Sequence, residues 1–74
     1  MKTVKQFKKF EENPAQWAGE TLDHNLFHIK YEDGMLIVSI DQSKMILDYG
    51  GVVDSVMETE TMQYLTRGIL LWRK

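Results

Sequence analysis

His24 and His28 are the two histidines of this sequence, and histidine is the side chain best suited to bind a metal ion or to move a proton near neutral pH. A spacing of four residues brings two histidines to one ion when they share a helix face, as in HExxH proteins. His28, however, falls in a segment that indicates a β-strand, where four residues span about 13 Å. No third ligand has an obvious place, so we predict neither a metal site nor a cofactor.

Nucleophilic catalysis requires a base oriented beside a nucleophile, and His28 with Ser39 is the one such pair that the predicted strand pairing brings together. Serine and histidine often lie opposite each other on solvated sheets, and neither an acid nor an oxyanion loop accompanies this pair. Gly50-Gly51 has neither GxGxxG spacing nor the lysine of a phosphate-binding loop. We therefore predict that the protein is not an enzyme.

Length and composition predict one small domain spanning residues 1–74. The longest apolar runs, Met35 to Val38 and Ile69 to Trp72, have four residues each, against the about 20 that a membrane span needs. No apolar stretch follows the lysines at the N-terminus, so a secretory signal is not supported. The absence of cysteine fits a reducing compartment. We expect a cytoplasmic protein with no membrane partner.

Charge is unevenly distributed along the chain. Residues 1–10 and 61–74 carry seven basic residues and no acid, whereas all eleven acids lie between them. Lys5, Lys8 and Lys9, interleaved with phenylalanines on the first predicted helix, favour contact with nucleic-acid phosphates. This is the alternative function, together with an acidic inhibitor that imitates nucleic acid. The net charge of −2 weighs against binding a polyanion.

Residues 27–49 predict a three-stranded antiparallel meander. Asp33-Gly34 is a favoured two-residue hairpin turn, and pairing outward from it sets Glu32 opposite Met35 and His28 opposite Ser39. One face of this hairpin is then entirely apolar, with Phe27, Ile29 and Tyr31 against Leu36, Val38 and Ile40. A slip of one residue would mix the two faces, so burial itself determines the pairing.

A second turn at Gln42-Ser43 predicts the third strand, from about Lys44 to Tyr49. In this register Ile40 lies opposite Met45, Val38 opposite Leu47 and Leu36 opposite Tyr49. Gln-Ser is a poor turn pair, so the sequence determines this strand better than its register. Gly50-Gly51 is expected to end the strand.

The N-terminal segment, residues 3–12, predicts an amphipathic helix. Val4, Phe7 and Phe10 recur every three residues, and Thr3 is a suitable cap. Asn13-Pro14 ends this helix, because the residue before proline avoids the α region. A short turn carrying Trp17 is expected to follow and to close at Gly19.

The C-terminal third is ambiguous between two structures. Ser55 and Glu58 have the spacing of a capping box, and Met62, Leu65, Ile69 and Trp72 fall on one helical stripe. Alternatively, Arg67-Gly68 ends the helix and residues 69–73 form a fourth strand. The predicted fold is therefore α+β: an N-terminal helix, a three-stranded antiparallel meander and a C-terminal helix, with both helices on one sheet face.

Apolar residues near the C-terminus exceed what one sheet face can cover. Ile69, Leu70, Leu71 and Trp72 are consecutive, so a helix through them is apolar almost all round. Ile37 likewise lies on the polar face of the hairpin. Uncovered apolar surface usually marks an interface, which predicts Ile37, Leu70, Leu71 and Trp72 as partner contacts. We therefore predict a small non-enzymatic protein-interaction or regulatory module, a homodimer, that binds and modulates another protein, for instance as an inhibitor.

Overall fold

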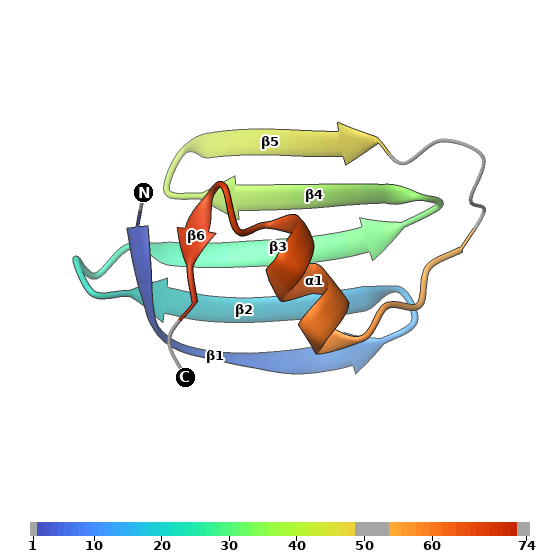
Figure 1. Cartoon of the computed structure of the whole chain (residues 1–74), viewed down its shortest axis with the longest axis horizontal. Helices are drawn as coiled ribbons and strands as arrows, with labels where there is room; N and C mark the ends of the chain where they lie inside the picture. The colour runs from blue at the N-terminus through green and yellow to red at the C-terminus, as the bar shows by residue number, and fades with distance from the viewer. Residues whose placement is uncertain (1, 49–53, 73–74) are drawn as a thin grey trace.

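The computed structural model describes residues 2–48 and 54–72, which fold into a curled, mixed six-stranded sheet with one short helix on one of its faces (Figure 1). The elements are β1 (Lys2–Glu12), β2 (Ala15–Thr21), β3 (Leu26–Glu32), β4 (Met35–Ile40), β5 (Ser43–Asp48), α1 (Thr59–Leu65) and β6 (Leu70–Leu71). The strand order is β5-β4-β3-β2-β1-β6. Neighbours from β1 to β5 are antiparallel, whereas β6 runs parallel to β1.

The predicted N-terminal helix is wrong, because Lys2–Glu12 forms strand β1. Its pairing with β2 has register shifts between Val4 and Gln6 and between Lys9 and Glu11. Each shift inserts a residue, so Val4 and Phe7 both contact the core although they are three residues apart. A strand with such irregularities therefore reproduces the three-residue spacing that is typical of a helix. The predicted turn around Trp17 is likewise a strand, β2.

The hairpin centred on Asp33-Gly34 has the register predicted from burial, with Glu32 opposite Met35 and His28 opposite Ser39. Asp33 and Gly34 both have positive φ, as this turn requires. The register of the third strand was wrong by two residues, since Ile40 pairs with Ser43 rather than Met45. Asp41 adopts a φ of 57°, which places the turn one residue earlier, at Asp41-Gln42. The predicted ends of this strand, Tyr49 and Gly50-Gly51, lie outside the described residues.

The long C-terminal helix is also wrong. Helix α1 covers only Thr59–Leu65, with Glu58 rather than Ser55 at its N-cap and no capping side-chain hydrogen bond. Turn residues follow from Thr66, and Leu70–Leu71 then form β6 beside Lys2 and Thr3 of β1. The strand predicted as the alternative for residues 69–73 therefore exists over two residues, although it belongs to a different fold.

The core lies between α1 and the face of the sheet that it covers, here named the inner face (Figure 1). Its buried apolar residues are Val4, Ala15, Trp17, Phe27, Ile29, Tyr31, Leu36, Val38, Met62 and Leu70. Two tryptophan N–H groups attach the C-terminal part of the chain: Trp17 donates to Oγ1 of Thr59 at 3.0 Å, and Trp72 donates to Oγ1 of Thr66 at 2.9 Å. Among the described residues, no helix has the length and apolar character needed to cross a membrane.

Candidate binding groove on the outer face

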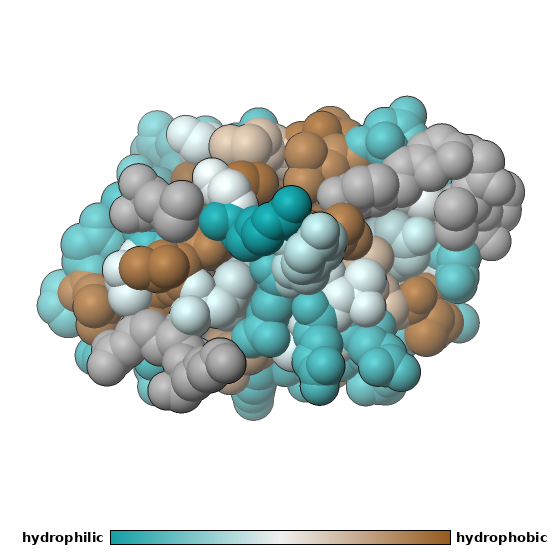
Figure 2. Space-filling model, viewed as in Figure 1, coloured by the Kyte–Doolittle hydropathy of each residue, from teal (hydrophilic) through white to brown (hydrophobic). Residues whose placement is uncertain are grey.

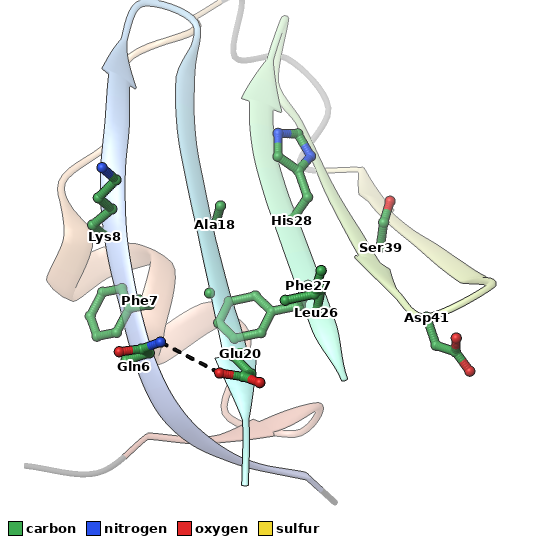
Figure 3. A pocket seen from close by; sticks show the side chains of 11 residues that line it. Gln6, Phe7, Lys8, Ala18, Glu20, Leu26, Phe27, His28, Ser39 and Asp41 are labelled. Carbon is green, nitrogen blue, oxygen red and sulfur yellow. Dashed lines mark hydrogen bonds between the residues drawn. The ribbon is translucent and has the colours of Figure 1, made fainter. Parts of the chain in front are cut away.

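The sheet face opposite α1, here named the outer face, carries a groove with a volume of about 670 Å³ (Figure 3). The lining residues come from four neighbouring strands and the turn after β4: Gln6, Phe7, Lys8, Ala18, Gly19, Glu20, Leu26, Phe27, His28, Ser39 and Asp41. The pairing registers align Lys8, Ala18, His28 and Ser39 in one row across β1 to β4. The groove therefore runs across the strands rather than between two layers.

Small residues of β2 make the hollow. Ala18 is the outward side chain at the centre of the row, and Figure 3 shows it as a short stub between Lys8 and His28. Gly19 is beside it, and an added Cβ there would lie 2.4 Å from the main-chain oxygen of Gln6 and 2.5 Å from the Phe27 ring. A larger residue would therefore require these atoms to move. The space beside Gly19 is therefore filled by Gln6, Phe7 and Phe27, and the glycine adds no side chain to the hollow.

The walls of the groove combine apolar and charged side chains. Leu26, the first residue of β3, is 72% exposed and contributes apolar surface. Lys8 contributes a positive charge, whereas Glu20 and Asp41 contribute two carboxylates. Glu20 accepts a long hydrogen bond, 3.4 Å, from Nε2 of Gln6. The groove thus offers apolar contact and a small excess of negative charge.

His28 is held toward β2 rather than toward Ser39. Its Nε2 lies 3.1 Å from Oε1 of Gln16, and its ring lies 5.7 Å from the ring of Phe10, centroid to centroid. Burial, and to a smaller degree the charge of Lys30, lowers the pKa of His28 below its usual value. The imidazole is therefore neutral at neutral pH, with Nε2–H as donor to the Gln16 oxygen. Among the described residues no hydrogen bond joins His28 to Ser39, so the geometry supplies no oriented base for that hydroxyl.

The four predicted interface residues do not form one surface. Leu70 is fully buried in the core. Trp72 packs against the core, and the centroid of its ring lies 4.8 Å from the centroid of the Phe7 ring. Leu71 is 53% exposed on β6. Ile37 is half-buried on the outer face of β4, which β3, β2 and β1 separate from β6. Two of the four residues are therefore engaged within the domain itself.

The three lysines proposed to contact nucleic acid lie on strand β1, and their side chains do not all lie on the same face of the sheet. Lys5 is exposed at the first register shift of β1, and Lys8 lines the groove. Lys9 lies on the inner side, where Nζ donates to the main-chain oxygen of Met57 at 2.7 Å and lies 3.3 Å from a carboxylate oxygen of Glu12. They therefore do not form a common basic surface.

In the described part of the chain, no three histidine, cysteine or acidic residues are grouped so that they could hold a metal ion. His24 and His28 are on different elements, since His24 lies in the turn between β2 and β3, 3.4 Å from a carboxylate oxygen of Glu20.

No protein-family model matches the chain, no curated protein is significantly similar to it, and no solved structure matches it significantly. The functional argument therefore depends on the geometry of the sheet and its side chains.

Sequence reasoning missed the groove because it assigned β2 to a turn. Read as a strand, residues 15–21 alternate between buried Ala15, Trp17 and Thr21 and outward Gln16, Ala18 and Glu20. The small Ala18 between two longer polar residues is the signal that could have indicated a hollow. That signal has meaning only after the strand has been assigned.

Proposed function

We propose that this chain is a small non-enzymatic protein-interaction module that acts by binding and modulating another protein, with the outer-face groove as its binding site. The observation that carries the proposal is Leu26, an apolar side chain 72% exposed at the wall of a hollow whose floor is Ala18 and Gly19. Apolar surface of this kind is typical of contacts with other proteins. The absence of cysteine supports a reducing compartment, and we propose the cytoplasm.

The chemistry of the groove indicates what kind of segment it accepts. A volume of about 670 Å³ holds several side chains, but the hollow is open along the outer face rather than closed around a small ligand. Glu20 and Asp41 outnumber Lys8, and His28 is neutral near pH 7 because its pKa is lowered. We expect a partner segment that places an apolar side chain on Ala18 and a basic side chain near the two carboxylates.

Nucleic-acid binding has less support from the geometry. Lys9 is turned to the inner side, and Lys30, the lysine beside the groove on β3, lies 3.2 Å from a carboxylate oxygen of Glu32. Phosphate binding needs several cations on one surface.

A photocrosslinking amino acid at Leu26 tests the proposal in extract of the host. We expect a discrete protein adduct from this position and none from the same amino acid at Tyr64, which is 62% exposed on α1. Excess unlabelled chain should suppress the adduct. The Ala18→Arg chain should not, because its long side chain fills the hollow without entering the core.

The matched control is Thr61→Arg, which places the same side chain on an exposed position of α1. It should compete as well as the wild-type chain. Equal adducts from Leu26 and Tyr64, or equal competition by the Ala18→Arg and wild-type chains, would contradict binding at the groove. Circular dichroism of each variant verifies that competition is compared between folded proteins.

A further inference from the structure

Both histidines of the chain lie at the outer-face groove. His28 lines the groove from β3, in the row that also contains Lys8. His24 lies in the turn before β3, and its Nδ1 is 3.4 Å from a carboxylate oxygen of Glu20, which lines the groove from β2. Histidine is the side chain whose charge ordinarily changes between pH 5 and 8. Protonation of either histidine therefore changes the charge of the same surface.

His28 is held neutral by its surroundings. Its Nε2 lies 3.1 Å from the uncharged Oε1 of Gln16. Burial and the charge of Lys30 lower the pKa of His28 below its ordinary value of 6.5, so the ring gains its second proton only on acidification. The charged residues around it come from each neighbouring element: Lys8 of β1, Glu20 of β2, Lys30 of its own strand, Asp41 after β4 and Lys44 of β5.

His24 acts on the groove through its carboxylate contact. The side chain of His24 is 75% exposed, whereas that of Glu20 is 23% exposed. The acid next to His24 in the chain, Asp23, is paired with Lys2 at 2.6 Å. A protonated His24 therefore forms a charged pair with Glu20 and offsets one of the two carboxylates that line the groove.

The charge of the groove changes sign when both histidines are protonated. At neutral pH, Glu20 and Asp41 oppose Lys8, which leaves an excess of one negative charge. Lys30 and Lys44 are not among the lining residues, and Lys30 lies 3.2 Å from a carboxylate oxygen of Glu32. Carboxylic acids ordinarily take up protons near about pH 4, so at pH 5 the two carboxylates remain charged while the histidines add two positive charges.

We propose that acidification reverses the net charge of the groove through His24 and His28, and thereby releases a partner segment that is bound through a basic side chain. The release rests on the binding function proposed above, whereas the charge reversal is a property of this chain alone. Opposite charges at an exposed site contribute a few-fold each to affinity, so two changes should raise the dissociation constant at least about threefold.

Two nitroxide spin labels of the same shape, one with an ammonium group and one with a carboxylate, measure the charge beside each main-chain amide by NMR relaxation. At pH 7.5 the ammonium label should broaden the amide signals of Glu20, Leu26 and Asp41 more than the carboxylate label does. At pH 5 this order should reverse. The double variant H24N/H28N should keep the same order at both pH values, and each single variant should leave the groove near neutral at pH 5.

The amide of Thr61 is the internal control, because helix α1 contains no histidine. Figure 2 shows hydrophilic surface over this helix, on the face opposite the groove. The order of the two labels at Thr61 should not change between pH 7.5 and pH 5. A groove whose order of labels is also unchanged, or a reversal that persists in H24N/H28N, would overturn the proposal.

The photocrosslinking amino acid at Leu26 tests the release. The chain binds host extract at pH 7.5, is washed at pH 7.5 or pH 5, and is then irradiated. The wash at pH 5 should lower the adduct yield at least about threefold for the wild-type chain and less for H24N/H28N, each protein being compared with itself.

Equal losses in the two proteins would overturn the release through the histidines. A missing adduct after the wash at pH 7.5 would contradict the binding function and the release with it. The spin labels decide the charge reversal independently, so the two failures are distinguishable. Circular dichroism at both pH values verifies that each protein is folded.

Discussion

Replacing Thr66 by valine should destabilise the domain by removing two hydrogen bonds, one of which accounts for most of the loss. Thr66 follows α1 and is fully buried. Its hydroxyl donates to the main-chain oxygen of Met62 at 2.9 Å and accepts the Nε1–H of Trp72 at 2.9 Å. Valine has nearly the same shape but neither function, so it removes both bonds without opening a cavity.

The two lost bonds do not cost the same. The oxygen of Met62 retains a second donor, the main-chain N–H of Thr66 at 3.0 Å, so its bond with the hydroxyl is partly redundant. The N–H of Trp72 has no other acceptor among the described residues, and its ring packs against Phe7 and Phe27. An unsatisfied buried donor costs about 1–3 kcal/mol, and we expect about 1.5–2 kcal/mol because Trp72 is only partly buried. A domain of this length has a total stability of only several kcal/mol.

Urea unfolding, followed by circular dichroism, measures this loss in a double-mutant cycle with Trp72→Phe. Phenylalanine has no N–H to leave without an acceptor, so Thr66→Val should cost about 1 kcal/mol less in the Trp72→Phe background. Equal costs in the two backgrounds would refute the assignment of the loss to Trp72. A Thr66→Val protein as stable as wild type would refute the hydrogen-bond argument altogether.

Three further outcomes can be measured on the same protein. Gly19→Ala should cost about 1–3 kcal/mol in urea unfolding because its Cβ collides with main-chain and ring atoms, whereas Gly68→Ala, with no atom within 4 Å of the added Cβ, should stay within about 0.5 kcal/mol of wild type. The lowered pKa of His28 means that the unfolded chain binds a proton more readily, so stability should fall as the pH drops below the ordinary value of 6.5, and His28→Asn should flatten that part of the profile. A hydrogen bond from Lys2 and a second from a threonine lower the pKa of Asp23 from 3.8 to about 2, so stability present above pH 3.8 should be lost on acidification toward pH 2, and less of it in Asp23→Asn.

The sequence determined one hairpin in full because two independent signals agreed there. Asp33-Gly34 supplies the positive φ values of a two-residue turn, and only one register separates apolar from polar side chains. At the next turn the signals disagreed. Asp41 adopts a positive φ that no local pattern required of it, and a shift of two residues keeps the same faces, so burial could not detect the error.

The N-terminal third could not be predicted from periodicity, because the register shifts of β1 change the period. Val4 and Phe7 face the core three residues apart, and Phe10 then points to the outer face beside His28. A helix assignment for residues 3–12 removes both β1 and its pairing with β2. Since the groove is built on these two strands, its lining residues were beyond reach once that assignment had been made.

The apolar surplus that suggested an interface exists: Leu71 is 53% exposed, but most of the exposed apolar side chains are residues other than the four predicted. At the C-terminus it is absorbed within the domain: Leu70 is buried beside β1, and Trp72 packs on two phenylalanine rings. A helix of seven residues covers only part of one sheet face, so some apolar side chains of the outer face and of β5 remain exposed, as Leu26 and Ile46 show. Among residues 2–48 and 54–72, one short helix packs on one face of the six-stranded sheet. The groove on the outer face is therefore exposed because the one short helix packs on the opposite face of the sheet.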